Sequence, residues 1–173
     1  LGLQHAVWRP RALDAWRRAG FRCGQTIIDF GAGPGFASFD LADAVRAEGR
    51  VLSWERNDHF LAHINAMKAA RHLPQIETRQ LDLAADGVWA RWIFAFLPNL
   101  RKALARLAAC IKPGGVAVIH ECFDYRSWRL FPRVASFESF VDEVMSSWRE
   151  ADGDPGGARV DCAEAANKQA GPC

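Results

Sequence analysis

The sequence predicts an α/β protein with three layers, in which helices cover a doubly wound, mostly parallel sheet. Apolar, strand-like segments alternate with segments of helical periodicity along residues 1–150, the pattern of strands joined by right-handed crossovers. The stretch Thr26–Phe36, T-I-I-D-F-G-A-G-P-G-F, joins a short strand, a glycine turn and a helix start. This layout brings the backbone close to a nucleotide-like ligand at a helix N-terminus.

The expected elements follow from periodicity. Helical spacing of apolar residues predicts helices over residues 1–19, 36–47, 58–73, 100–111 and 136–148. Apolar runs and alternation predict strands over residues 26–30, 50–55, 75–83, 87–96 and 116–120. The aromatic run 87–96 is typical of a central strand, a turn is expected at Pro113-Gly114-Gly115, and the strand after it is expected to be buried. We expect one domain over residues 1–150 and an irregular tail over residues 151–173, which are rich in Gly, Ala and Asp.

Composition excludes several classes of function. Half of the 173 residues are apolar, 24% are charged and the net charge is +2, so we expect neither nucleic acid nor an anionic membrane as partner. Five cysteines without a C-x-x-C motif argue against a disulfide framework or a metal site and favour a cytoplasmic location. No apolar stretch reaches the ~18 residues of a membrane span, and no signal-peptide pattern is present.

The glycine turn by itself is compatible with two kinds of ligand. A dinucleotide fingerprint has the spacing G-x-G-x-x-G/A, but here Gly35 comes one residue early and Phe36 takes the place of the third small residue. Ala37 and Ser38 are small, so an NAD-dependent oxidoreductase stays an alternative. Glu55 lies about 20 residues past the turn, where an acid binds a ribose diol in either class.

Four motifs together resemble class I S-adenosylmethionine-dependent methyltransferases over about residues 4–129. They are Asp29-Phe30-Gly31-Ala32-Gly33-Pro34-Gly35, Glu55, Leu81-Asp82-Leu83 and Lys112-Pro113-Gly114-Gly115. The resemblance implies a Rossmann-like methyltransferase fold and S-adenosylmethionine as cofactor. It implies cofactor contacts by Asp29, Gly31, Ala32, Gly33, Gly35, Glu55, Arg56, Asp82, Leu83 and Arg91.

The chemistry of the cofactor suggests a role for each acid. Asp29 is expected to bind the ammonium group, Glu55 to accept both ribose hydroxyls, and Asp82 to accept from the adenine amino group. Structural roles remain as alternatives: a turn cap for Asp29, an exposed strand-end charge for Glu55 and a helix N-cap for Asp82.

The acceptor is expected to be a small molecule that is methylated on oxygen or nitrogen. His120, Glu121, Asp124 or Tyr125 is expected to take its proton as a general base, with a local hydrogen bond as the alternative role of His120 and Glu121. No N-P-P-Y-type motif points to an amide or base nitrogen.

Two departures from the family pattern suggest a truncated homologue. Only Leu83, Ala84 and Ala85 separate Asp82 from Asp86, too few for a crossover helix, so we expect a displaced third strand or a shifted Asp82. The C-terminal strand pair of the family is missing from the pattern, which leaves the fifth strand as an exposed edge open to homodimer formation. A non-catalytic module that binds an S-adenosyl ligand is therefore the second hypothesis.

Overall fold

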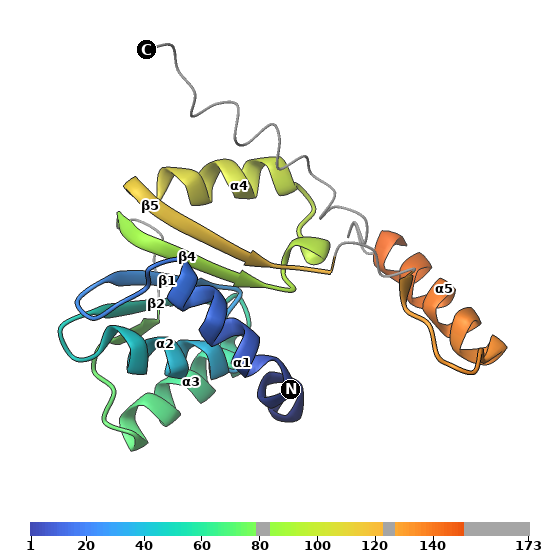
Figure 1. Ribbon diagram of the computed structural model, residues 1–173, viewed down its shortest axis with the longest axis horizontal. Helices are drawn as coiled ribbons and strands as arrows, with labels where there is room; N and C mark the ends of the chain where they lie inside the picture. The colour runs from blue at the N-terminus through green and yellow to red at the C-terminus, as the bar shows by residue number, and fades with distance from the viewer. Residues whose placement is uncertain (79–83, 123–126, 151–173) are drawn as a thin grey trace, which may run out of the picture. The chain divides into compact units, whose positions relative to one another are not determined.

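The computed structural model describes residues 1–78, 84–122 and 127–150 (Figure 1). The chain divides into two compact units, Leu1–Arg91 with Arg101–His120 and Trp92–Leu100 with Glu121–Cys173. The elements in chain order are α1 (Gly2–Arg18), β1 (Thr26–Phe30), α2 (Phe36–Val45), β2 (Arg50–Trp54), α3 (Asp58–Ala70), β3 (Ile76–Thr78), β4 (Ala85–Arg91), η1 (Phe94–Phe96), α4 (Leu100–Ala109), β5 (Ile111–His120) and α5 (Ala135–Glu150).

The first unit is built on a parallel five-stranded sheet in the order β3-β2-β1-β4-β5. α1, α2 and α3 lie on one side of this sheet and α4 lies on the other (Figure 1). The predicted doubly wound α/β fold is therefore confirmed. β1 occupies the middle position, so the glycine turn that follows it stands at the carboxyl edge of the sheet, where ligands bind in open α/β folds.

The core under α1, α2 and α3 explains why these helices form. Ile27 of β1 and Trp89 of β4 point to this side and are almost fully buried. The Trp89 ring meets Trp16 of α1 edge-on, with ring centroids 5.3 Å apart. Helical spacing in α2 brings Leu41, Ala42 and Val45 into the same cluster. Each fully buried aliphatic side chain stabilises the fold by roughly 1.5–3 kcal/mol.

The fourth strand is shorter than predicted. β4 ends at Arg91 rather than Phe96, because Trp92 adopts a φ of 53° and a left-handed residue cannot continue a β ladder. Phe94–Phe96 then form one turn of 3₁₀ helix. The aromatic run indicated burial correctly, since Phe94 and Ala95 are buried. It could not separate strand from helix, because both can be apolar throughout.

The fifth strand differs from prediction in its start and its exposure. β5 begins at Ile111, and the expected turn at Pro113–Gly115 lies within it as an irregularity where the pairing shifts from Ala85↔Ile111 to Gly87↔Val116. Gly114 has a φ of 80°, which accommodates the extra residues. Most of β5 is exposed rather than buried, including Ile119 at 47%, because in the described part of the chain it pairs with β4 alone.

The third strand is present at the outer edge of the sheet, beside β2. It covers Ile76–Thr78 of the predicted 75–83, and the structure describes no helix between β3 and β4. Asp82 and Leu83, named as cofactor residues, lie outside the described residues. The same holds for Asp124, Tyr125 and the predicted tail 151–173.

The second unit gathers η1 and α5 around a small apolar cluster of Ala95, Val141 and Met145. The rings of Phe96 and Trp148 meet edge-on, with centroids 5.0 Å apart. α5 covers the predicted 136–148 and extends it at both ends. Its apolar residues follow the helical spacing expected of one buried face.

Candidate cofactor site

The turn after β1 has a backbone that only glycine adopts easily. Gly31, Gly33 and Gly35 have φ angles of 77°, 56° and 84°, in the left-handed region that strains other residues. The N–H groups of Gly31 and Ala32 donate to the Trp54 carbonyl at 2.9 and 3.0 Å. The turn is therefore anchored to the end of β2.

Two of these glycines have different surroundings. A Cβ added at Gly33 would meet no atom within 4 Å, whereas a Cβ at Gly35 would stand 2.7 Å from Cγ1 of Ile64. Gly35 is therefore needed for the packing of α2 against α3. Gly33 faces open space, which a bound ligand can use for close approach to the backbone.

Glu55 follows β2 directly, and its half-buried carboxylate lies against the glycine turn. Oε2 accepts from the Gly33 N–H at 2.8 Å. Oε1 accepts from the backbone N–H groups of Arg56 and Asn57 at 2.7 and 2.8 Å. Oε2 has a further lone pair, so the carboxylate is held rigidly and can still accept from a ribose hydroxyl. The side chain of Arg56 is exposed.

Asp29 lies at the end of β1 and is only 2% exposed. Its Oδ2 accepts from the Ser38 hydroxyl at 2.6 Å, and Ser38 in turn accepts from Ser53 at 2.8 Å. Burial raises the pKa of Asp29 to about 6, although Ser38 and the nearby Arg91 lower it. A buried acid of this kind at the turn is typical of a functional site.

His120 ends β5 and pairs in register with Arg91 of β4. Its ring lies 5.1 Å from the Trp8 ring and 5.8 Å from the Trp89 ring, centroid to centroid. Burial lowers the pKa of His120, and the charges of Arg91 and Arg11 lower it further. The imidazole is therefore neutral at neutral pH and able to accept a proton.

Glu121 belongs to the second unit. Its Oε2 accepts from the Phe94 N–H and its Oε1 from the Cys122 N–H, both at 3.0 Å. Two backbone partners favour the alternative of a local hydrogen-bonding role for this carboxylate.

Sequence reasoning missed a polar cluster formed by α1, α2 and β4. His5 contacts Asp40 and Arg91, and Asp40 also accepts from Arg9. Spacing was the one signal in the sequence, since His5 and Arg9 stand one helical turn apart on the same face. Their partners could not be predicted, because Arg91 is 86 residues away from His5.

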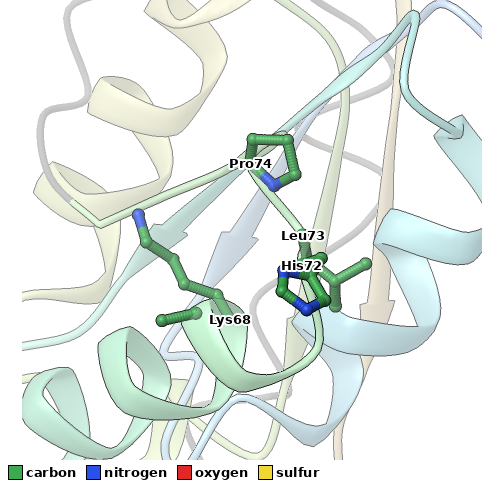
Figure 2. A pocket seen from close by; sticks show the side chains of 5 residues that line it. Lys68, His72, Leu73 and Pro74 are labelled. Atoms are coloured by element: carbon green, nitrogen blue, oxygen red, sulfur yellow. The ribbon is translucent and has the colours of Figure 1, made fainter.

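A surface pocket of about 410 Å³ is lined by Lys68, Ala69, His72, Leu73 and Pro74 (Figure 2). These residues end α3 and precede β3, so they stand at the amino ends of the strands. The glycine turn stands at the carboxyl ends. This pocket is therefore separate from the cofactor site.

The described ranges 1–78, 84–122 and 127–150 lack two kinds of feature. Within them, no three His, Cys, Asp or Glu side chains are grouped as a metal site would require. None of the helices there has both the length and the hydropathy of a membrane span.

Comparison with known proteins agrees with this geometry. The family model described as "Methyltransferase domain" matches residues 28–119. A SAM-dependent methyltransferase from Aquifex aeolicus superposes with a TM-score of 0.60 at 18% identity, covering 78% of this chain and 77% of that one. Coclaurine N-methyltransferase, solved with N-methylheliamine and SAH, superposes with a TM-score of 0.58 at 20% identity, covering 64% of this chain and 35% of that one.

The fold, with its glycine turn and strand-end acid, agrees with the predicted class, the class I S-adenosylmethionine-dependent methyltransferases. The chain belongs to the methyltransferase domain family, since the matched region is more than half of its length.

Curated relatives are similar over most of this chain. Trans-aconitate 2-methyltransferase of Methylobacterium nodulans is 28% identical over 148 residues, covering 80% of this chain and 55% of that protein. The enzyme of the same name from Azoarcus sp. is 30% identical over 125 residues, covering 68% and 47%. Demethylmenaquinone methyltransferase of Desulfitobacterium hafniense is 25% identical over 120 residues, covering 64% and 46%. The chain spans about half the length of these relatives.

Proposed function

We propose that this chain binds S-adenosylmethionine at the carboxyl edge of its sheet and transfers the methyl group to oxygen or nitrogen of a small molecule. The observation that supports the proposal most is the combination at Gly33: open space beside its Cα and a direct hydrogen bond from its N–H to Glu55. A ligand in that space contacts the backbone and a ribose-binding acid at once.

The residues of the turn fit the parts of the cofactor. Gly31, Ala32, Gly33 and Gly35 form the wall beside the amino acid part and the sugar. Glu55 accepts the two ribose hydroxyls, and Arg56 flanks it. Asp29 faces the ammonium group, and Arg91 faces the carboxylate. Asp82 and Leu83 are the residues proposed to contact the adenine.

The methyl group of the cofactor is already activated as a sulfonium, so the protein's main task is to place the acceptor in line with it. His120 stands at the carboxyl end of β5 with a neutral imidazole, and it takes the proton of the acceptor's hydroxyl or ammonium group. Asp124 and Tyr125 remain proposed alternatives for this step, and Glu121 is a weaker one because of its backbone partners.

Isothermal titration of the purified chain tests cofactor binding. S-adenosylhomocysteine is expected to bind and NADH is not, because the early third glycine departs from the dinucleotide fingerprint. Glu55→Gln is expected to weaken S-adenosylhomocysteine binding roughly 10- to 100-fold, since hydrogen bonds to a charged group contribute about 1.5–3 kcal/mol. Glu77→Gln removes the same charge from the exposed Arg50–Glu77 pair and serves as the matched control, with unchanged affinity.

Other outcomes distinguish the alternatives. Binding of NADH alone contradicts the methyltransferase proposal and supports the oxidoreductase. Binding of S-adenosylhomocysteine without turnover of any phenol, amine or carboxylic acid supplied with S-adenosylmethionine supports the non-catalytic module.

The edge of β5 supports a second part of the proposal, a homodimer in which this chain pairs with its own copy. Val116 and Ile119 are 39% and 47% exposed there, and an exposed apolar edge strand pairs readily. We expect a dimer in size-exclusion chromatography with light scattering. Ile119→Lys should shift it to monomer, because a charge on an edge strand opposes pairing. A monomeric wild-type chain contradicts the dimer without bearing on cofactor binding.

A further inference from the structure

A buried histidine near the start of α1 connects three elements of the first unit. His5 is 8% exposed. Its Nδ1 lies 3.1 Å from Nη2 of Arg91, and its Nε2 lies 3.0 Å from Oδ2 of Asp40. The same Asp40 oxygen accepts from Nε of Arg9 at 2.8 Å. His5 is therefore held on both ring nitrogens.

These partners determine which ring nitrogen of His5 carries the proton. A guanidinium has donors and no acceptor, so Nδ1 of His5 must accept from Arg91. Nε2 must then carry the hydrogen, which it donates to Asp40. The carboxylate of Asp40 thus selects the tautomer whose Nδ1 is able to hold Arg91.

Arg91, which His5 contacts, lies beside the glycine turn that is proposed to bind the ligand. Arg91 is the last residue of β4, one residue past the Phe30↔Ala90 pair, and so lies next to the turn that begins at Gly31. The His5 ring also stacks on Phe36, with centroids 5.5 Å apart and planes at 24°. His5 therefore contacts residues on both sides of the glycine turn.

We propose that His5 is a positioning residue that holds the Arg91 guanidinium at the carboxyl end of β4, where Arg91 binds the carboxylate of the cofactor's amino acid part. This inference rests on the proposed function. Arg91 is half-buried, and burial lowers its pKa against the opposing effect of Asp29 and Asp40. A desolvated guanidinium of fixed orientation binds a carboxylate more strongly than a mobile one, because less entropy is lost.

Two substitutions of similar size separate the roles of the two ring nitrogens. In His5→Asn the amide oxygen stands close to the place of Nδ1 and can still accept from Arg91. In His5→Gln the amide reaches the place of Nε2, so the contact with Asp40 is kept and the acceptor for Arg91 is lost. Arg9→Ala is the control, because Arg9 contacts Asp40 through a side chain that is 47% exposed.

The ligands are S-adenosylhomocysteine and 5′-methylthioadenosine, which has the same nucleoside but neither carboxylate nor ammonium. By isothermal titration, His5→Gln is expected to weaken S-adenosylhomocysteine about tenfold, the effect of one hydrogen bond, and to leave 5′-methylthioadenosine unchanged. His5→Asn is expected to retain most of the wild-type affinity for both ligands. Arg91→Gln should resemble His5→Gln with a larger loss.

The possible failures are distinguishable. If the wild-type chain binds neither ligand, the proposed function itself fails. If Arg91→Gln weakens S-adenosylhomocysteine alone while His5→Gln binds as wild type, the role of His5 is overturned. Equal loss of both ligands in the two His5 variants would also overturn it, because it would show a general effect on folding.

Discussion

Gly33→Val is expected to abolish S-adenosylhomocysteine binding, a loss of more than about 100-fold, while the chain stays folded. The valine side chain points into the open space beside the turn, where a Cβ meets no protein atom within 4 Å. It therefore fills the volume that the cofactor needs. The φ of 56° strains a non-glycine residue by roughly 1–2 kcal/mol, which a domain of this size can tolerate.

Gly24 offers a matched control for this backbone strain. It has a φ of 82°, it also faces open space, and it lies before β1 at the opposite edge of the sheet. Gly24→Val should lose similar stability and bind normally in the same titration. Gly35→Ala should lose more stability than Gly33→Val in thermal unfolding, because its Cβ would stand 2.7 Å from Ile64. Wild-type affinity in Gly33→Val would show that the site lies elsewhere.

The second large effect concerns the pH dependence of stability and the buried acid Asp29. Its pKa is raised from an ordinary 3.8 to about 6 by burial. Between these values the folded state holds a proton that the unfolded state has lost, so the free energy of unfolding falls as pH rises. The contribution is fully present below about pH 4 and lost above about pH 6, and it changes by about 2 kcal/mol between pH 4.5 and 7.5.

Asp29→Asn removes this titration and keeps an oxygen that accepts from Ser38. We expect the variant to be more stable than wild type by about 1 kcal/mol at pH 7.5, since its buried N–H group offsets part of the gain. Urea unfolding gives the free energy of unfolding of both proteins at the two pH values. The change between the two pH values is then compared between the proteins, so that the contributions of the other carboxylates cancel. Identical pH profiles would contradict a raised pKa for Asp29.

The same substitution tests the function of Asp29. If the carboxylate faces the ammonium group of the ligand, Asp29→Asn should weaken S-adenosylhomocysteine and leave 5′-methylthioadenosine unaffected. A more stable protein with lower affinity is the expected signature of a charge kept for binding. Unchanged affinity for both ligands would support the alternative role of Asp29 as a structural partner of Ser38.

Local patterns alone determined much of the fold. β1 was predicted with its observed limits, and α2, β2 and α3 with small shifts at their ends, because each depends on the spacing of apolar residues within one segment. The glycine turn was predicted because three left-handed residues in five leave little choice but glycine. The position of Glu55 at the end of its strand was also predicted, because it follows from the length of one βαβ unit.

Tertiary structure decided what depends on neighbours distant in sequence. An apolar strand such as β5 has the same composition whether its faces are covered or exposed, so composition could not show that most of it is exposed. Its position at the edge of the sheet was predicted from the family pattern, and the strand order β3-β2-β1-β4-β5 agrees with it in the described part of the chain. The end of β4 at Arg91 depends on the left-handed backbone of Trp92, which no sequence motif indicates. Arg91 acquires its partner His5 across 86 residues, a contact that exists because α1 packs beside α2 and the end of β4.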